Sequence, residues 1–439
     1  MKTRRKFLAC GAAALAAPLF HPVRLGAAPA NDRINLGMIG MGRQAYFSNL
    51  KAFLAEKDVQ VVAVCDVDSW RAEQGKLAIE EAYGKSAPSG TYKGCAVFRD
   101  FHELLARPDI DAVMVSTPDH WHVPVSLAAG QAGKDVSCEK PLTLGIREGR
   151  LLADAMKKMG RVFRTDSEFR STTIFHRCCE IARNGKIGKL TRIDTGTPTE
   201  QLRDIPVAEV PVPPELDYKA WLGPARDAPY QVERVHPPKL LKARPGWMCI
   251  RDYCDGMVSN WGCHLNDIAQ WAMGTDDTGP VAVKAEGSLF DKGLWNVLSR
   301  FEAWFRYANG VELHCRMDKP FIRIEGEKGW VQAIYGEPVI EASDESLLRY
   351  KAGEGEISLP LLSEKRNFLD CVRSRARTVA DAEVGHRTTS LSHLAHAVIK
   401  AKAEGWVDWD PVKEIFPKHP DLDALASRAF WRPGTELKA

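Results

Sequence analysis

Residues 34–45 read INLGMIGMGRQA, and this stretch is the most informative one about the fold of the N-terminal part of the chain. An apolar, strand-like run ends at Gly40, and the small residues Gly40, Gly42 and Ala45 follow with the spacing G-x-G-x-x-A. Residues 44–56 then show a helical pattern. A glycine-rich turn between a strand and a helix lets the backbone approach a diphosphate, which rests on the free N–H groups at the helix start. The stretch therefore predicts the first unit of a dinucleotide-binding sheet.

The next strand-like run, residues 59–66, ends in Asp66. An acidic residue about 20 positions beyond the glycine turn can accept hydrogen bonds from both hydroxyls of an adenosine ribose. Because a carboxylate repels a 2′-phosphate, Asp66 favours NAD(H) over NADP(H). Arg43, inside the turn, is placed to contact the phosphates. The alternative is a glycine turn of an ordinary doubly wound sheet, with Asp66 capping the next helix.

The chain beyond this unit has the pattern of two domains. Four β-branched runs alternate with helical stretches, which predicts a parallel sheet covered by helices on both faces. The four runs are residues 34–40, 59–66, 111–117 and 135–141. After residue 163, strand-like runs follow one another with few helices between them, which predicts a mostly antiparallel open sheet: 190–196, 280–287, 302–310 and 311–317.

The expected fold class is therefore α/β, with an N-terminal Rossmann domain over residues 31–160. A C-terminal α+β domain over residues 161–439 is expected to bind substrate and form oligomers, with its last helices packing back on the body. Residues 204–247 are rich in proline and low in periodicity, which indicates a long surface excursion. Loops of that length are commonly functional or disordered.

The first 30 residues read as an export signal. Arg4 and Arg5 precede an Ala-rich apolar run that reaches Phe20, and no acidic residue occurs before Asp32. This layout is typical of a twin-arginine signal peptide, and the run is too short for a comfortable membrane span. We expect residues 1–30 to be removed after export to the periplasm, with the Tat translocase as the partner during export.

Without that signal the charge of the chain is nearly balanced. Five of the 60 basic residues lie in residues 1–30, so 55 remain against 57 acidic residues, a formal charge of −2. This balance argues against nucleic acid or a membrane surface as a partner. Of the 11 cysteines, all but Cys10 lie beyond the signal. A chain this long buries a full core without disulfides, so we expect reduced, buried cysteines.

Two motifs at expected strand ends carry a family resemblance. TPDHWH (117–122) and CEKPLT (138–143), together with DGMVSNWGCHLNDIAQW (255–271), resemble the glucose-fructose oxidoreductase and inositol dehydrogenase family, often called Gfo/Idh/MocA. The resemblance covers nearly the whole chain after the signal. It implies an NAD-dependent oxidoreductase that acts on a sugar, a sugar derivative or a cyclitol.

Lys140 is the first expected catalytic residue. It follows a parallel strand at its carboxyl end, where doubly wound sheets place their ligands. An ammonium there can hydrogen-bond a substrate hydroxyl and stabilise a developing alkoxide, and the family gives the equivalent lysine this role. The alternative is an ordinary surface ion pair with its neighbour Glu139. Thr117 and Pro118 are expected to border the nicotinamide, and His122 is expected only as a wall of the cofactor site. Glu139 and Lys140 are also expected among the cofactor-binding residues.

His264 is the expected acid–base residue, because a histidine exchanges protons near neutral pH. In the resembled family a carboxylate usually stands four residues earlier, one helical turn away, but here that position is Asn260. An amide can orient a hydroxyl but cannot accept a proton. Asp267 also lies on that face and is expected to support the helix. The alternative for His264 is a hydrogen-bonded core residue.

A metal site in the sequence around His264 is a further alternative. The possible ligands are Cys249, Cys254, Cys263, His264 and Asp267. No pair of them has the spacing typical of a zinc site, so no metal is expected.

Three functions remain open at this level. A dehydrogenase exported in the folded state can carry its cofactor with it, so NAD(H) can be held tightly and reused in place. The second function is glycoside cleavage by oxidation, elimination and re-reduction without net redox change. The third is a sugar-binding protein that has lost catalysis, which Lys140 and His264 argue against. Family resemblance also implies a homodimer or homotetramer.

Overall fold

Six parallel strands form the first sheet. The computed structural model describes residues 33–86, 94–427 and 437, and the described residues from Ile34 onward group as one compact unit. The strand order is β3-β2-β1-β4-β5-β6, and every neighbouring pair is parallel, as in dinucleotide-binding doubly wound sheets. The strands are β1 (Ile34–Ile39), β2 (Val59–Cys65), β3 (Ala96–Phe98), β4 (Ala112–Val115), β5 (Asp135–Cys138) and β6 (Phe163–Thr165).

Helices cover this sheet, which explains why its central strands are apolar on both faces. Every side chain of β4 and β5 is buried. One covering helix comes from late in the chain: Phe368 and Leu369 of α11 pack in one core with Leu36 and Phe53. The helices are α1 (Leu50–Ala55), α2 (Ser69–Ser86), α3 (Phe101–Leu105), α4 (His122–Gln131), α5 (Ile146–Lys158) and α11 (Glu364–Ser374).

Eight strands form the second sheet, in the order β13-β12-β11-β7-β10-β9-β8-β14. Only β7 and β10 run parallel as neighbours; the other pairs are antiparallel. The expected α/β fold class with its two kinds of sheet is thereby confirmed. The strands are β7 (Leu190–Thr197), β8 (Ala282–Leu289), β9 (Leu298–Arg306), β10 (Glu312–Met317), β11 (Phe321–Gly326), β12 (Gly329–Ile334), β13 (Glu341–Ala342) and β14 (Val407–Asp408).

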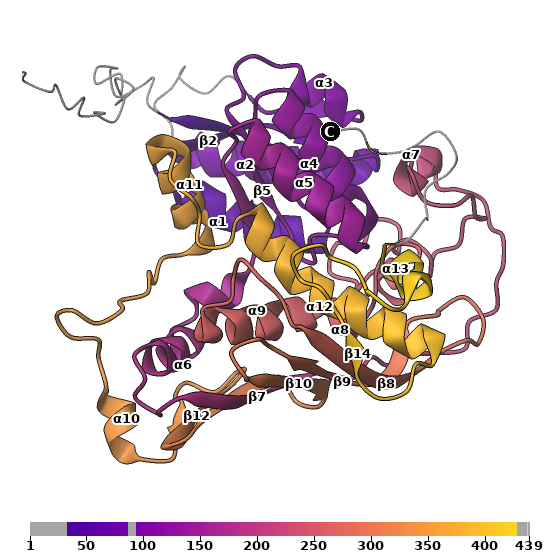
Figure 1. The fold of residues 1–439 in the computed structure, drawn as a ribbon. Coiled ribbons are helices and arrows are strands. Elements are labelled where there is room, and N and C mark those ends of the chain that lie inside the picture. The colour runs from indigo at the N-terminus through magenta and orange to yellow at the C-terminus, as the bar shows by residue number, and fades with distance from the viewer. Residues whose placement is uncertain (1–32, 87–93, 428–436, 438–439) are drawn as a thin grey trace, which may run out of the picture. The chain divides into compact units, whose positions relative to one another are not determined.

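Helices α6, α9 and α12 lie along one side of the second sheet (Figure 1). Helix α12 also contacts α5 of the Rossmann part. The helices of this part are α6 (Thr173–Arg183), α7 (Tyr218–Leu222), α8 (Met257–Asn260), α9 (Gly262–Met273), α10 (Glu345–Arg349), α12 (Ala382–Ala401) and α13 (Pro420–Ser427).

Two expectations about chain organisation need comment. Strand β6 pairs with β5, so the first sheet continues past residue 160, where we expected its domain to end. The predicted signal peptide, residues 1–30, lies outside the described residues. Within the described part of the chain, no helix combines the length and hydropathy needed to cross a membrane.

Residues 204–247 are more than the surface excursion we expected. They carry α7 and contribute Trp221, Tyr230 and Val235 to a separate buried core. The expectation holds for most of the segment, whose residues are largely exposed or half-buried, but it missed this core because proline hides periodicity without preventing burial. We call residues 204–247 the roof segment, because they cover the cavity described next.

Candidate active site

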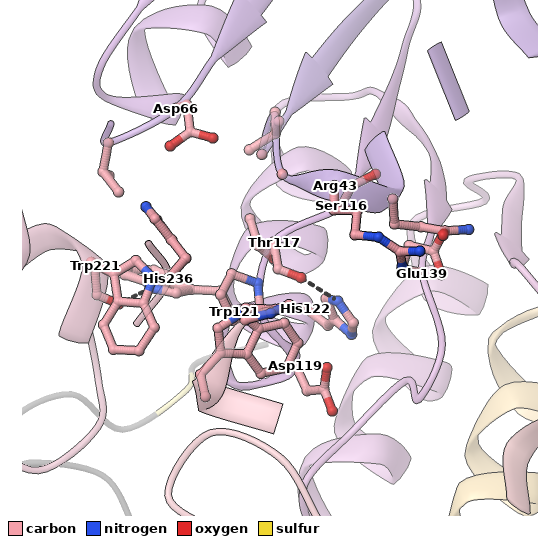
Figure 2. A pocket seen from close by; sticks show the side chains of 18 of the residues that line it. Arg43, Asp66, Ser116, Thr117, Asp119, Trp121, His122, Glu139, Trp221 and His236 are labelled. Atoms are coloured by element: carbon pink, nitrogen blue, oxygen red, sulfur yellow. Dashed lines mark hydrogen bonds between the residues drawn. The ribbon is translucent and has the colours of Figure 1, made fainter. Parts of the chain in front are cut away.

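A cavity of about 780 Å³ lies at the carboxyl ends of the Rossmann strands. This volume is within the usual range for sites of small molecules and cofactors. The ends of β1, β2, β4 and β5 line one side, and roof-segment residues such as Trp221 and His236 line another (Figure 2). Residues from α8 and α9 complete the wall. Among the predicted cofactor residues, every one except Ala45 lines this cavity.

The glycine turn has the shape that a diphosphate requires. Gly40 has φ +86°, and a Cβ there would lie 2.7 Å from the backbone carbonyl group of Ser116, so only glycine fits. A Cβ on Gly42 would meet no atom within 4 Å, which leaves open space in the cavity beside the turn. Arg43 is exposed at its rim. The residues present therefore fit a bound dinucleotide.

Ala45 serves packing rather than contact. It is fully buried and begins a π-helical segment, η1 (Ala45–Asn49), that leads into α1. A small residue at this position lets the helix lie close to the strand. Sequence reasoning gave the residue type correctly but placed it in the cradle itself.

Asp66 holds the turn as well as facing the cavity. Its Oδ2 accepts from the backbone N–H of Met41 at 2.6 Å, and Oδ1 accepts from that of Asp68 at 2.8 Å. Burial raises the pKa of Asp66 despite these two bonds. Each carboxylate oxygen keeps one lone pair free, so hydrogen bonds from a ribose remain compatible with this arrangement.

The ends of β4 and β5 are joined by His122. Its Nδ1 lies 2.8 Å from the carbonyl oxygen of Pro141 and its Nε2 lies 2.9 Å from that of Thr117 (Figure 2). Burial lowers the pKa of His122 to about 4, so the neutral ring donates to one carbonyl at a time. Thr117 Oγ1 is buried without a hydrogen-bond partner among the described residues, and Pro118 lies beside it in the cavity wall.

Glu139 and Lys140 do not form the surface ion pair that was the alternative. Glu139 is buried and accepts from Asn49 Nδ2 at 2.9 Å. Lys140 lines the cavity, and its Nζ donates to the backbone carbonyl oxygen of Asn260 at 3.4 Å. The Lys140–Pro141 peptide bond is cis. Asn49 was missed by sequence reasoning, because nothing in its local pattern marks it.

His264 and Asn260 line the same cavity as Lys140. The His264 ring stacks on Phe169 with centroids 4.5 Å apart, and Nε2 lies 3.8 Å from Oε1 of Glu168. Burial, followed by the charge of Lys140, lowers the pKa of His264 well below its usual range. The imidazole is therefore neutral, and it is a weak proton acceptor unless an anion supports it.

Asp267 supports the helix, as expected, and does not replace the missing acid. It forms a buried pair with Arg170, with an N–O distance of 2.7 Å, and it also accepts from Ser167. Arg170 contacts Asp276 in addition. Arg170 and Asp267 therefore hold neighbouring elements together and do not line the cavity.

The structure adds residues that the sequence did not single out. Asp119 lines the cavity, and burial raises its pKa to about 7. Trp121 Nε1 and His120 Nε2 both contact the carbonyl oxygen of Trp221, at 2.9 Å and 3.0 Å, which ties the TPDHWH stretch to the roof segment. Tyr335, which follows β12, also reaches the cavity.

No group of three or more histidine, cysteine or acidic side chains suited to a metal occurs in the described part of the chain. The ten cysteines among the described residues are buried and free of disulfides, and burial raises the pKa of thiols such as Cys254. They are packing residues rather than reactive thiols.

A Rossmann sheet whose glycine turn, acidic residue and lysine share one cavity defines a nicotinamide-dependent oxidoreductase. The chain belongs to the Gfo/Idh/MocA oxidoreductase family. Residues 34–167 match the model of its NAD-binding Rossmann fold, and residues 203–433 match that of its C-terminal alpha/beta domain. These matches confirm the resemblance and the cofactor class expected from the glycine turn.

Curated relatives match over shorter stretches. A myo-inositol 2-dehydrogenase of Thermotoga maritima is 31% identical over 191 residues, 42% of this chain and 48% of that protein. A glycosyl hydrolase family 109 protein of Saccharopolyspora erythraea is 36% identical over 132 residues, 30% of this chain and 28% of that protein. The chain thus spans less than half the length of either relative.

A solved structure supports the fold over most of the chain. The aldose-aldose oxidoreductase from Caulobacter crescentus, crystallised with glycerol, superposes with a TM-score of 0.61 at 18% identity. The alignment covers 86% of this chain and 99% of that one. At this identity the likeness concerns the fold alone.

Proposed function

We propose that this protein is an NAD(H)-dependent oxidoreductase that acts on a hydroxyl group of a sugar, a sugar derivative or a cyclitol. One observation carries the proposal: Lys140 and His264 line the same cavity as the glycine turn and Asp66. Asp66 would hold the adenosine ribose, and the open space beside Gly42 would take the diphosphate. The nicotinamide, when bound, supplies a hydride acceptor for the carbon that bears the substrate hydroxyl.

The chain's own residues then handle the proton. Lys140 Nζ donates to the substrate oxygen and stabilises negative charge that develops there. His264, neutral in the buried site, is available to accept the hydroxyl proton. Trp247, Trp261 and Tyr335 line the cavity near these groups, and aromatic faces suit the apolar face of a sugar ring.

We also propose that the cofactor stays bound and is reused in place. The roof segment is hydrogen-bonded to the loop after β2: Ser69 N–H donates to Glu215 O and Asp217 N–H donates to Val67 O, each at 2.9 Å. His236 Nε2 lies 3.1 Å from Asp68 Oδ2. Several of these contacts must break before a dinucleotide can leave past the roof segment, which supports slow exchange.

Slow exchange fits the proposed export. The twin-arginine pattern in residues 1–30 supports passage through the Tat translocase into the periplasm, and a folded protein can carry its cofactor along. For the mature protein we propose a homodimer or homotetramer. Helices lie along one side of the second sheet (Figure 1), and we infer that its other side takes part in assembly.

A second candidate is glycoside cleavage without net redox change. The sequence match to a glycosyl hydrolase family 109 protein favours it. In that reaction His264 removes the proton from the carbon next to the oxidised position, and the glycosidic oxygen takes up a proton and leaves as an alcohol. Water would then add to the double bond formed, and return of the hydride to the oxidised carbon would leave no net redox change. The same cavity serves both candidates, so products must decide between them.

The test uses protein purified without added nucleotide. It is filtered natively, then denatured, and both fractions are analysed for NAD(H) by absorbance and mass. Stoichiometric NAD(H) only after denaturation is expected, and a His236→Ala variant should lose it faster than wild type. Sugar pairs are then screened for mutual oxidation and reduction, and glycosides for cleavage. Protein that binds no NAD(H) at any concentration would overturn the proposed function.

A further inference from the structure

Glu168 meets His264 beside the cavity. Its Oε1 lies 3.8 Å from His264 Nε2, and 42% of its side chain is exposed, against 6% for the imidazole. The carboxylate thus touches both a buried ring and solvent. Catalytic hydrogen bonds are often longer than usual before substrate binds, so this separation is compatible with a bond that shortens during reaction.

We propose that Glu168 supplies the carboxylate that position 260 lacks, and that it moves the reacting proton between His264 and solvent. This inference rests on the proposed oxidoreductase function. Glu168 is a positioning residue in this scheme, because it acts through His264 and not on the substrate itself.

The framework fixes this pair in space. Glu168 begins a short 3-10 turn, η3 (Glu168–Ser171), and Phe169 in the same turn stacks on the His264 ring at 4.5 Å. Arg170, one residue on, forms the buried pair with Asp267, one helical turn beyond His264 on α9. The ion pair and the stacked ring therefore hold the turn against α9, and the carboxylate stays beside the imidazole.

Three other carboxylates of this region are already engaged. Asp267 accepts from Arg170 and Ser167, and Glu139 accepts from Asn49. Glu364 is ion-paired with Lys365 at 3.1 Å. Glu168, by contrast, faces His264 and water, so it can gain or lose a proton without breaking a buried pair.

The charges around Glu168 suit this role. Burial, followed by the carboxylates of Glu364 and Glu139, raises the pKa of Glu168 to about 7, and Lys140 and Lys365 oppose the rise. His264 is a further titratable neighbour. A carboxyl group with a pKa near the working pH both takes up and releases a proton readily.

The proton route balances without a further reactant. The substrate O–H gives its proton to Nε2 of His264, the nitrogen that faces Glu168; Nδ1 is buried without a hydrogen-bond partner among the described residues and keeps the ring's own proton. The imidazolium then passes the proton from Nε2 to the Glu168 carboxylate, which releases it to water. When a carbonyl is reduced, the same protons move in the opposite order.

The first test measures turnover against pH for wild type, Glu168→Gln and Glu168→Asp, with exposed Glu345→Gln as the control. We expect Glu168→Gln to lower kcat on the order of 10²-fold and to remove the pH limb near 7, with NAD(H) content unchanged. Glu168→Asp should keep part of the activity. Adding Asn260→Asp to Glu168→Gln should restore a pH-dependent rate, because it returns a carboxylate to the face of His264.

A second readout needs no turnover. In protein labelled with ¹⁵N-histidine, the His264 ring signals, assigned with His264→Gln, should shift with an apparent pKa near 7, and Glu168→Gln should abolish the shift. Unchanged signals or an unchanged pH profile in Glu168→Gln would overturn the inference. Failure of the proposed function is distinguishable, since it would show as absent NAD(H) while the ring titration persists.

Discussion

The side-chain ammonium of Lys140 donates to the backbone carbonyl oxygen of Asn260 across 3.4 Å. This contact joins the carboxyl end of β5 to the last residue of α8, directly before the helix that carries His264. The Rossmann sheet and the second part of the chain therefore meet at the two groups proposed for catalysis, and their separation is set by tertiary packing.

Replacing Lys140 tests the donor. Lys140→Met should lower kcat by about 10²- to 10⁴-fold, because the substrate oxygen loses its positively charged hydrogen-bond donor. The NAD(H) content should stay the same, since the glycine turn and Asp66 are untouched. Lys140→Arg keeps the charge but not the geometry and should recover little activity. Full activity in Lys140→Met would contradict the assignment.

Alanine substitutions at the two glycines of the turn should have different effects on stability and on NAD binding. Gly40→Ala should lower the free energy of unfolding by about 2 kcal/mol or more, because φ +86° and the nearby backbone at Ser116 leave no room for a Cβ. Gly42→Ala should change stability by less than about 0.5 kcal/mol. It should nevertheless weaken NAD binding about tenfold, because the new methyl group enters the space expected for the diphosphate.

Chemical denaturation separates stability from binding in these variants, and calorimetric titration of nucleotide-free protein measures the affinity. Equal stability losses at both positions would show that Gly42 serves folding rather than the cofactor.

The buried pair between Arg170 and Asp267 should be a main support of the site. Asp267→Ala should cost about 3 kcal/mol of stability, because the side chain of Arg170 is only 1% exposed and loses its fully buried partner. Asp277→Ala is the matched control: its pair with Arg377 is exposed, so the cost should stay below about 1 kcal/mol. Urea unfolding curves of both variants give the comparison.

Acid should loosen the contact between α5 and α12. Arg150 binds Glu383 and Glu414, with N–O distances of 2.6 Å and 2.9 Å. Burial alone would raise the pKa of each glutamate. Hydrogen bonds to Arg150 and Arg387 lower the pKa of Glu383 to about 2, and hydrogen bonds to His386 and Arg150 lower the pKa of Glu414 to about 2.

A depressed carboxyl pKa gives stability that is present above about pH 4.5 and is lost as the pH falls toward 2. The thermal midpoint of the wild type should therefore drop across this window. Glu383→Gln should be less stable at pH 7, by about 2 kcal/mol, and should show a shallower drop. Parallel midpoint curves for the two proteins would contradict this account.

Local sequence patterns predicted most of the fold. The apolar runs that end at Gly40 and Asp66 became β1 and β2, because a parallel sheet buried on both faces needs continuous apolar strands. The buried side chains of the roof segment were not predicted, because its irregular chain shows no hydrophobic periodicity. Strand β6 is short, and its place in the first sheet depends on pairing with β5.

Local sequence patterns predicted only part of the candidate site. Lys140, Thr117 and His122 could be placed because the carboxyl ends of parallel strands meet at one edge of a sheet. Asn49 and Tyr335 could not, because each approaches the site from an element whose own sequence has no site pattern. Ala45 shows the opposite error: a motif position was taken for a contact although it packs the helix on the strand.

The dinucleotide turn, the acidic residue after β2 and the lysine at the end of β5 could be recognised without a structure, because their chemistry follows from local spacing and strand direction. The surroundings of His264 could be recognised only from the packed fold. Glu168 is 96 residues away in the chain, and it reaches the imidazole because η3 and α9 are held together by the buried Arg170–Asp267 pair. Such a contact depends on long-range packing, which no local pattern of residues records.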